Sequence, residues 1–453
     1  MPVDPNAMPR YLIVFVAVLL MVGGCAHYAP KPLPQQFSVP DSPSAVKVDV
    51  RRMPREVRHV WNPADGLDSE ETAMLAVANN PQLRASRAAL GVARAQVFAA
   101  GLLADPQLAF NEDYAMTPGT QNAWALGLGF DVGDWLMRSS RQRVARAGET
   151  AAAQQLLWQE WQVIGAARLG WLRVRDDERL LPLLQQEADG LRQRSLASRA
   201  AAASGNLPAD AAATAWQAWQ AAQSRCDDGR RQLQQDRLAL NALLGLGNAA
   251  QVELSGEWDA ALPDVAALRA QIGVRLDRRP DLRALRAAYV AQEASYRAAV
   301  LAQFPLLGIS INRAQDNYGD NSVGPGIVLS LPVFNRNRGN IAIARASRQQ
   351  LYDEYRASWL AARNEVEIAL GNLPWLEAQA RRLRRGLPQV GNTARAAGQA
   401  LRQGNLTAAD AQRLRQDWLD RRMDLIRLEQ SLAEQQIALG MLLGPDLLEQ
   451  KTP

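Results

Sequence analysis

The chain has 453 residues, 48% hydrophobic and 21% charged, which is enough apolar sequence for a large ordered body. Both histidines, His27 and His59, lie near the N-terminus, so the remaining sequence cannot form a Ser-His-Asp triad or a helical HExxH zinc site. The two cysteines, Cys25 and Cys226, are too far apart in sequence to indicate a disulfide framework. The net charge of +5 comes from arginines interspersed among acidic residues, which gives little support for a nucleic-acid partner.

The N-terminus has the pattern of a secretory signal peptide over residues 1–24, and translation starts at either Met1 or Met8. A short apolar run after Arg10 ends in small residues just before Cys25, and it is too short for a spanning helix. The tetrapeptide that ends at Cys25 resembles a bacterial lipobox, in which this cysteine becomes the lipidated first residue of the mature chain. An ordinary signal with an incidental cysteine is the alternative. Residues 25–66 are rich in proline and are predicted to be extended.

The rest of the sequence is predicted to contain two copies of one unit. The nonapeptide that begins at Pro81 agrees with the one that begins at Pro280 at seven of nine positions, at an offset of 199 residues. A single offset that persists along the chain indicates a duplication, whereas solenoid repeats run over about 20 to 50 residues. The predicted parts are a first repeat at 67–247, a linker at 248–263, a second repeat at 264–445 and a tail at 446–453.

Each repeat is expected to contain a helix, two strands, a long helix and a returning helix. The long helices would reach about 100 Å, which no globular core needs, so helices packed side by side are expected. Pro182, Pro374 and Pro388 predict kinks or short breaks in them. The predicted ranges are 68–104, 107–114, 123–132, 138–204 and 208–245 in the first repeat, and 264–303, 306–314, 325–333, 339–403 and 407–443 in the second.

The four predicted strands alternate large apolar residues with small or polar ones, so that one face of each strand is apolar. Their lengths and pattern are typical of strands that cross a bilayer as part of a β-barrel, and a soluble hairpin with one core face is the alternative. Four strands cannot close a barrel that hides its edges from lipid, so several chains must pool their strands. The residues predicted to face lipid are Leu108, Phe110, Trp124, Leu126, Leu128, Phe130, Leu307, Ile309, Ile311, Ile327, Leu329 and Leu331.

Signal peptide, lipobox, duplicated unit and shared barrel together resemble the TolC-type outer-membrane efflux proteins. The resemblance implies an α+β membrane protein in which three chains form a twelve-stranded barrel, four strands from each, continued by a helical tunnel across the periplasm. The segment from Leu331 to Ile341, with its Phe-Asn-Arg-Asn-Arg-Gly core, is similar to the CzcC-like cation and heavy-metal efflux group. The first repeat departs from this motif, so only one repeat supports the subgroup.

The resemblance also implies that the turns between long and returning helices contact a periplasmic adaptor and close the pore. Asp410 is similar to the family's constriction aspartate, and three copies around one axis would attract cations. Arg413 stands where a second aspartate is expected and could neutralise Asp410, or Asp410 could simply cap its helix. Asp210, five residues after its glycine, is not an exact equivalent. The predicted adaptor-contacting tips are Gly205, Asn206, Leu207 and Asp210, and Gly404, Asn405 and Leu406.

The function expected from the sequence is a passive exit duct for an inner-membrane pump, which the family resemblance suggests is of the RND type, and its adaptor. No catalytic residue, resident metal or cofactor is predicted. The adaptor itself, or another structural lipoprotein, is the first alternative, but it would have one helical hairpin between compact β domains. A secreted enzyme that uses an acid pair is the second, and scattered carboxylates disfavour it.

Overall fold

The computed structural model describes residues 28–53, 57–259, 264–304 and 306–444. The predicted signal peptide, Cys25 and the C-terminal tail lie outside these ranges. The chain divides into two units, 1–39 and 40–453, and the second contains all the helices and strands named below.

The second unit has the same order of elements twice, and each long helix ends at a position 199 residues from the other. The first set is α2 (Ser69–Asn79), α3 (Pro81–Ala100), β1 (Gln107–Asp113), β2 (Ala123–Asp131), α4 (Val132–Ala203) and α5 (Ala209–Leu243). The second set is α6 (Val265–Leu276), α7 (Pro280–Leu301), β3 (Leu306–Gln315), β4 (Asn321–Ser330), α8 (Arg338–Arg402) and α9 (Ala408–Leu443).

The helix predicted over 68–104 is two helices, α2 and α3, and the prediction of one continuous helix is wrong. Asn80 lies between them, and its Oδ1 accepts hydrogen bonds from the N–H groups of Gln82 (2.9 Å) and Leu83 (3.1 Å). Pro81 takes the first position of α3, where its missing N–H costs nothing. The second repeat breaks in the same way before Pro280, so 264–303 also holds two helices.

The long helices differ from the prediction at their start and at their prolines. Helix α4 begins at Val132 rather than 138, because the Asp131 carboxylate caps it by accepting from the Asp134 N–H at 3.0 Å. The helices continue through Pro182, Pro374 and Pro388, so the predicted breaks do not occur. Each proline removes one hydrogen bond from a ladder of more than sixty residues, and neighbouring turns hold the helix together.

The four strands form one antiparallel sheet in the order β1-β2-β3-β4. The contact between the two repeats within the sheet is the β2–β3 pair, in which Leu128 lies opposite Ile311. Strand β4 ends at Ser330, so Leu331 lies just beyond the strand in which it was predicted. The Leu331 carbonyl accepts from the Val333 N–H at 2.9 Å across Pro332, and this tight turn ends the ladder.

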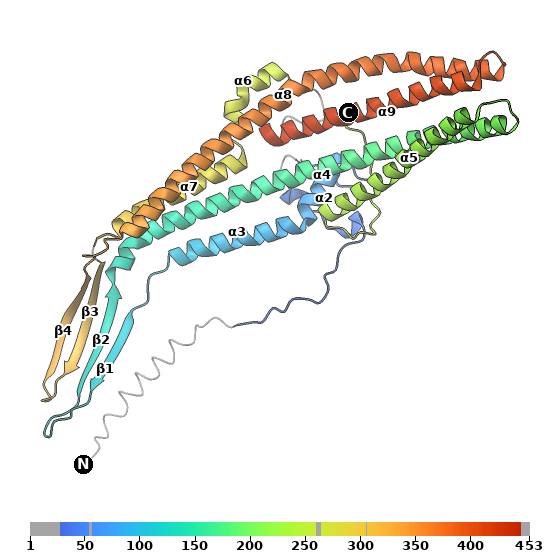
Figure 1. The fold of residues 1–453 in the computed structure, drawn as a ribbon. Coiled ribbons are helices and arrows are strands. Elements are labelled where there is room, and N and C mark those ends of the chain that lie inside the picture. Colours follow the sequence, from blue (N-terminus) through green and yellow to red (C-terminus); the bar gives the residue numbers. More distant parts are fainter. Residues whose placement is uncertain (1–27, 54–56, 260–263, 305, 445–453) are drawn as a thin grey trace. The chain divides into compact units, whose positions relative to one another are not determined.

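Two long helical hairpins, α4–α5 and α8–α9, extend from the part that carries the strands, and their turns lie at the end opposite the sheet (Figure 1). Helix α4 also packs against α7 and α9, which joins the two repeats. Near the turns this joint is a small core that includes Leu184, Cys226 and Leu419. Cys226 is buried there, as packing requires, and burial raises the pKa of its thiol.

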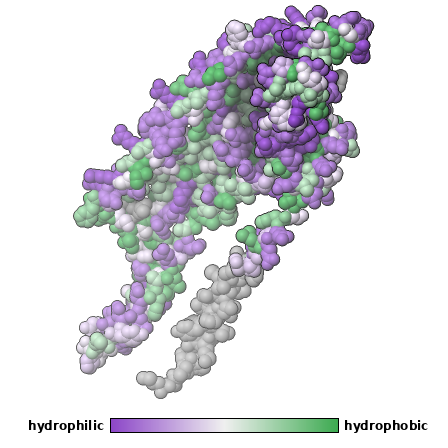
Figure 2. All heavy atoms as spheres, turned by 45° about the vertical axis from the view of Figure 1, so that its right-hand side comes forward, coloured by the Kyte–Doolittle hydropathy of each residue, from purple (hydrophilic) through white to green (hydrophobic). Residues whose placement is uncertain are grey.

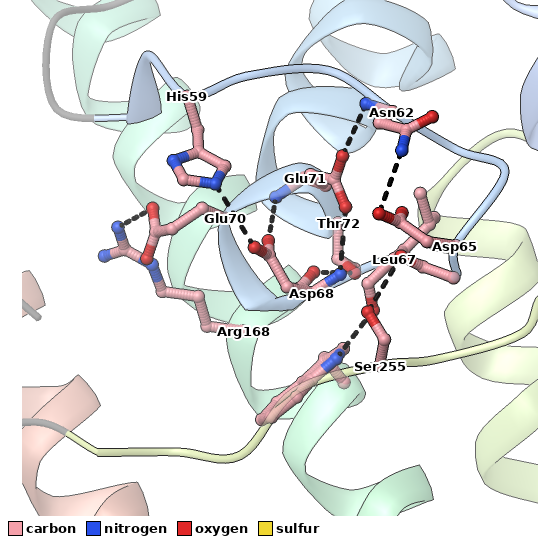
Figure 3. A network of polar contacts seen from close by, with 12 residues as sticks. His59, Asn62, Asp65, Leu67, Asp68, Glu70, Glu71, Thr72, Arg168 and Ser255 are labelled. Atoms are coloured by element: carbon pink, nitrogen blue, oxygen red, sulfur yellow. Dashed lines mark hydrogen bonds and ion pairs between the residues drawn. The ribbon is translucent and has the colours of Figure 1, made fainter. Parts of the chain in front are cut away.

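The segment before α2 is held against the start of that helix by a partly buried polar network (Figure 3). Glu71 accepts from the Asn62 N–H at 2.7 Å and from the Asp68 N–H at 3.2 Å, while Asp68 accepts from the Glu71 N–H at 2.7 Å. This reciprocal pair is a capping box. The Leu67 carbonyl accepts from the Ser255 N–H at 2.9 Å, so the linker between the repeats is bound to the same place.

Candidate functional site

The apolar face of the sheet is exposed in the single chain. Except for the half-buried Trp124, the side chains predicted to face lipid have exposed fractions between 37% and 74%. Figure 2 shows apolar atoms exposed among hydrophilic ones at the surface of the part that carries the strands. A contiguous apolar surface of this kind marks a membrane or protein contact.

The opposite face of the sheet is lined by glycine, serine and asparagine. The Asn312 side chain lies against both neighbouring strands, because a Cβ added at Gly127 or at Gly326 would lie 2.5 Å from its amide. The Asn312 Nδ2 donates to Ser310 Oγ at 3.1 Å. These small residues leave room beside the sheet, and the charged side chains on this face, Asp113 and Asp131, lie at strand ends.

Both hairpins turn in the same backbone geometry. Gly205 and Gly404 have φ values of 77° and 74°, which a residue with a side chain adopts only at a cost. The Asn206 and Asn405 N–H groups donate to carbonyls five residues back, at 2.8 and 2.9 Å, in the pattern of a Schellman motif. The tips are exposed except for Leu207 and Leu406, which are half-buried.

The second tip carries a polar network around Asp410 that the first tip lacks. Thr407 caps α9, because its Oγ1 accepts from the Asp410 N–H at 3.1 Å and donates to Asp410 Oδ2 at 2.6 Å. The Arg413 guanidinium lies 3.7 Å from Asp410 Oδ1. The cap residue is therefore Thr407, so the alternative that Asp410 caps this helix is wrong, and in the single chain Asp410 contacts both Thr407 and Arg413. In the first tip Pro208 precedes α5 without a side-chain cap, and Asp210 is exposed.

An open groove of about 430 Å³ follows α9 from Asp410 along its contact with α4. Two of the acids that line it, Asp417 and Asp420, were not predicted from the sequence. Burial, followed by the nearby carboxylate of Glu187, raises the pKa of Asp420. Glu187 itself is buried and pairs with Arg225 of α5, while its Oε2 has no hydrogen-bond partner. The spacing of Asp410, Asp417 and Asp420 on one helical face could have revealed these acids. The groove is lined by Leu191, Arg194, Ala409, Asp410, Gln412, Arg413, Gln416, Asp417 and Asp420.

The strand-to-helix junction of the second repeat has an unusual backbone. Arg336 and Asn337 have φ values of 45° and 56°, in the left-handed region that asparagine tolerates better than arginine. The Asn337 Nδ2 donates to the Ala299 carbonyl at 2.8 Å, which ties the start of α8 to the end of α7. The motif therefore holds the start of α8 against the end of α7.

The described residues contain neither a cluster able to hold a metal ion nor a helix able to cross a membrane. No group of three or more His, Cys, Asp or Glu side chains is placed to hold a metal ion within these ranges. None of the helices there combines the length and the apolar content that a membrane crossing requires.

Comparison with known proteins connects this architecture to a family. Residues 272–445 match the family described as outer membrane efflux protein. The cobalt-zinc-cadmium resistance protein CzcC of Cupriavidus metallidurans is 29% identical over 186 residues, which are 40% of this chain and 44% of that protein. The pyoverdine export outer membrane protein OpmQ of Pseudomonas putida is 32% identical over 160 residues, 33% of each chain. The alignments thus span less than half of the curated relatives.

Solved structures extend the likeness to nearly the whole chain. CusC is similar with a TM-score of 0.66 and 19% identity, covering 91% of this chain and 99% of its own. The outer-membrane channel OprN has a TM-score of 0.68 and 17% identity, covering 94% and 100%. The Campylobacter jejuni CmeC outer membrane channel has a TM-score of 0.68 and 16% identity, covering 95% and 96%. The chain therefore has the fold of the TolC-type outer-membrane efflux proteins, and the resemblance expected from its sequence is confirmed.

Proposed function

We propose that the protein is the outer-membrane exit duct of a tripartite efflux system. The observation that carries the proposal is a four-stranded sheet with an exposed apolar face and two edge strands, β1 and β4. An edge strand exposes unpaired N–H and C=O groups, which lipid cannot satisfy. Three copies that pair β4 of one chain with β1 of the next would form a closed barrel of twelve strands.

In this arrangement the face of small and polar residues with Asn312 lines the lumen, and the apolar face contacts lipid. The long hairpins continue the lumen into the periplasm, and Asp410 from each chain surrounds the pore near the tips. One carboxylate oxygen of Asp410 lies near the Arg413 guanidinium. The net charge of the ring formed by three Asp410 side chains therefore depends on whether this pair persists in the trimer. The duct is passive, and work comes from an inner-membrane pump, which the family resemblance suggests is of the RND type.

The tips are the proposed contact for a periplasmic adaptor. They are exposed, project away from the sheet and repeat almost the same backbone, so three chains would present six similar turns. The adaptor reading of this chain itself fits less well, because an adaptor needs one hairpin, whereas this chain has two hairpins and a sheet with an exposed apolar face.

Metal cations are the proposed substrate class, and lipidation of Cys25 is the proposed anchor in the outer membrane. The cation proposal rests on the similarity of part of the chain to CzcC, the resistance protein for cobalt, zinc and cadmium. The match to a pyoverdine exporter makes organic compounds the competing class. The anchor rests on the lipobox alone, because Cys25 lies outside the described residues.

The first experiment is electrophoresis of outer-membrane extracts without heating, followed by zinc, cobalt and cadmium tolerance of cells with and without the gene. A heat-resistant trimer in the outer membrane supports the duct, and a monomer in the periplasm contradicts it. Loss of metal tolerance in the deletion strain supports cations. Unchanged tolerance together with loss of secretion of an organic compound would replace the cation proposal and keep the duct.

A further inference from the structure

Near the end of the sheet that carries the turns, the apolar face holds a charged side chain, Arg313 of β3, and Glu112 of β1 lies on the same face. Along β3 the apolar side is formed by Leu307, Ile309 and Ile311, and the next position on this side is Arg313. Its cross-strand neighbours are Leu126 on β2 and Val323 on β4, and all three side chains are exposed. A charged side chain in this place is costly unless it reaches a polar layer.

Arg313 has an aromatic neighbour but no acidic one. Within the described ranges it forms no ion pair with an Asp or Glu side chain. Its guanidinium carbon lies 5.9 Å from the centre of the Trp124 ring, and the Trp124 Nε1 donates to Gln315 at 2.9 Å, which fixes that ring. Trp124 lies opposite Gln315, one step beyond Arg313 toward the turns. The guanidinium is therefore directed along the strand toward the turns, as a snorkelling arginine is.

The direction of the turns identifies the membrane surface that Arg313 reaches. All helices leave the sheet at the opposite ends of the strands, and the turns at 114–122 and 316–320 are polar. In the proposed duct the helices extend into the periplasm, so these turns face outward. A tryptophan and an arginine together at this height are typical of the boundary between hydrocarbon and headgroups.

The acids near this boundary leave the guanidinium available. Asp316 accepts from the N–H groups of Tyr318 at 2.8 Å and Asp320 at 2.9 Å within its own turn. Glu112 lies on β1 opposite Trp124, two strands away from Arg313, and accepts from Asn122 at 3.4 Å. The planar fork of arginine matches phosphate with two parallel hydrogen bonds.

We propose that Arg313, supported by Trp124, binds the phosphate of a phosphorylated glycolipid in the outer leaflet of the outer membrane. The inference rests on the proposed function, since it requires the apolar face to contact lipid. A trimer would carry three such sites on its outer surface. The site would set the depth of the barrel and would lie away from the lumen.

The test is native mass spectrometry of the delipidated trimer, titrated with lipid A, with dephosphorylated lipid A and with phosphatidylglycerol. The wild type is expected to prefer lipid A over both others. The Arg313→Gln variant is expected to bind lipid A about tenfold more weakly, the loss of about one charge-assisted contact. Arg385→Gln, which changes an exposed arginine on α8, is the control and should match the wild type.

Three results would overturn the site. The first is equal binding of lipid A by the wild type and by Arg313→Gln. The second is equal binding of lipid A and dephosphorylated lipid A by the wild type, a comparison that needs no variant. Equal binding of phosphatidylglycerol would overturn the assignment to a glycolipid. Channel conductance should be unchanged in Arg313→Gln. If the lipid-binding tests fail while conductance is intact, the proposed function stands. Absence of a trimer would refute the proposed function itself.

Discussion

The sheet and the hairpin tips meet different demands on the same duplicated plan. In the sheet the two repeats are nearly interchangeable, because every strand needs only an apolar side and a small polar side. At the tips the backbones agree within a few degrees of φ, yet the charges differ, since Thr407, Asp410 and Arg413 form a network in one tip only. The two repeats thus agree where backbone geometry determines the structure, and they differ in charge at the tips, where the proposed duct would contact its pore and its partner.

The largest effect is expected from a charge on the apolar side of the sheet. We expect Ile309→Arg to destabilise the assembled protein by about 2–4 kcal/mol and to abolish the heat-resistant trimer, because it places a cation in hydrocarbon. Its neighbour in the strand is the matched control, since Ser310 lies on the opposite face. Ser310→Arg should retain the trimer on unheated gels. Equal loss of trimer in both variants would contradict the assignment of the two faces.

A smaller effect is expected at the contact of α4 with α5. Burial first, and then the Asp236 carboxylate, raise the pKa of Asp177 from 3.8 to about 7. The native protein therefore holds a proton that the unfolded chain releases, and stability is lost as the pH rises from about 4 to about 7. The full change corresponds to about 4 kcal/mol, which water at this half-buried site reduces to about 1–2 kcal/mol.

Asp177→Asn should accordingly raise the unfolding temperature at pH 8 and have little effect at pH 4. The measurement is thermal unfolding of the purified protein across this pH range, with Asp228→Asn as an exposed control on α5. An unfolding temperature that depends on pH equally in wild type and Asp177→Asn would exclude this carboxyl as the cause.

The smallest effect is expected from glycine substitutions at and near the second tip. Gly404→Ala should destabilise by about 1 kcal/mol, because a side chain is strained at a φ of 74°. Gly398→Ala, in the interior of α8 with open space around its Cβ position, should stabilise by about 0.5–1 kcal/mol. Chemical denaturation of the two variants measures both changes in the free energy of unfolding. Destabilisation by Gly398→Ala would show that the space beside Gly398 is occupied in the trimer.

The sequence predicted the fold class and the strands because their signals are local and periodic. Alternation marks the faces of β2 and β3, and one offset relates the repeats. The break at Asn80 was missed, although Asn-Pro is a capping signal, because the apolar period continues across it. The junction at Arg336 and the pairing of Glu187 with Arg225 depend on contacts between distant segments. A local sequence pattern does not predict such contacts. The pairing of Asp410 with Arg413 was one of two alternatives, and it occurs in the single chain, whereas the cap of α9 is Thr407 and not Asp410. The role of Asp410 at the pore stays a prediction.

The most direct test of the duct is single-channel conductance of the purified trimer in planar bilayers. Wild type, Asp410→Ala and Asp210→Ala would be compared under a cation gradient, the last as the control from the other tip. We predict discrete cation-selective openings, with selectivity reduced in Asp410→Ala and retained in Asp210→Ala. Absence of any channel from a verified, membrane-inserted oligomer would contradict the duct and favour an adaptor or structural lipoprotein.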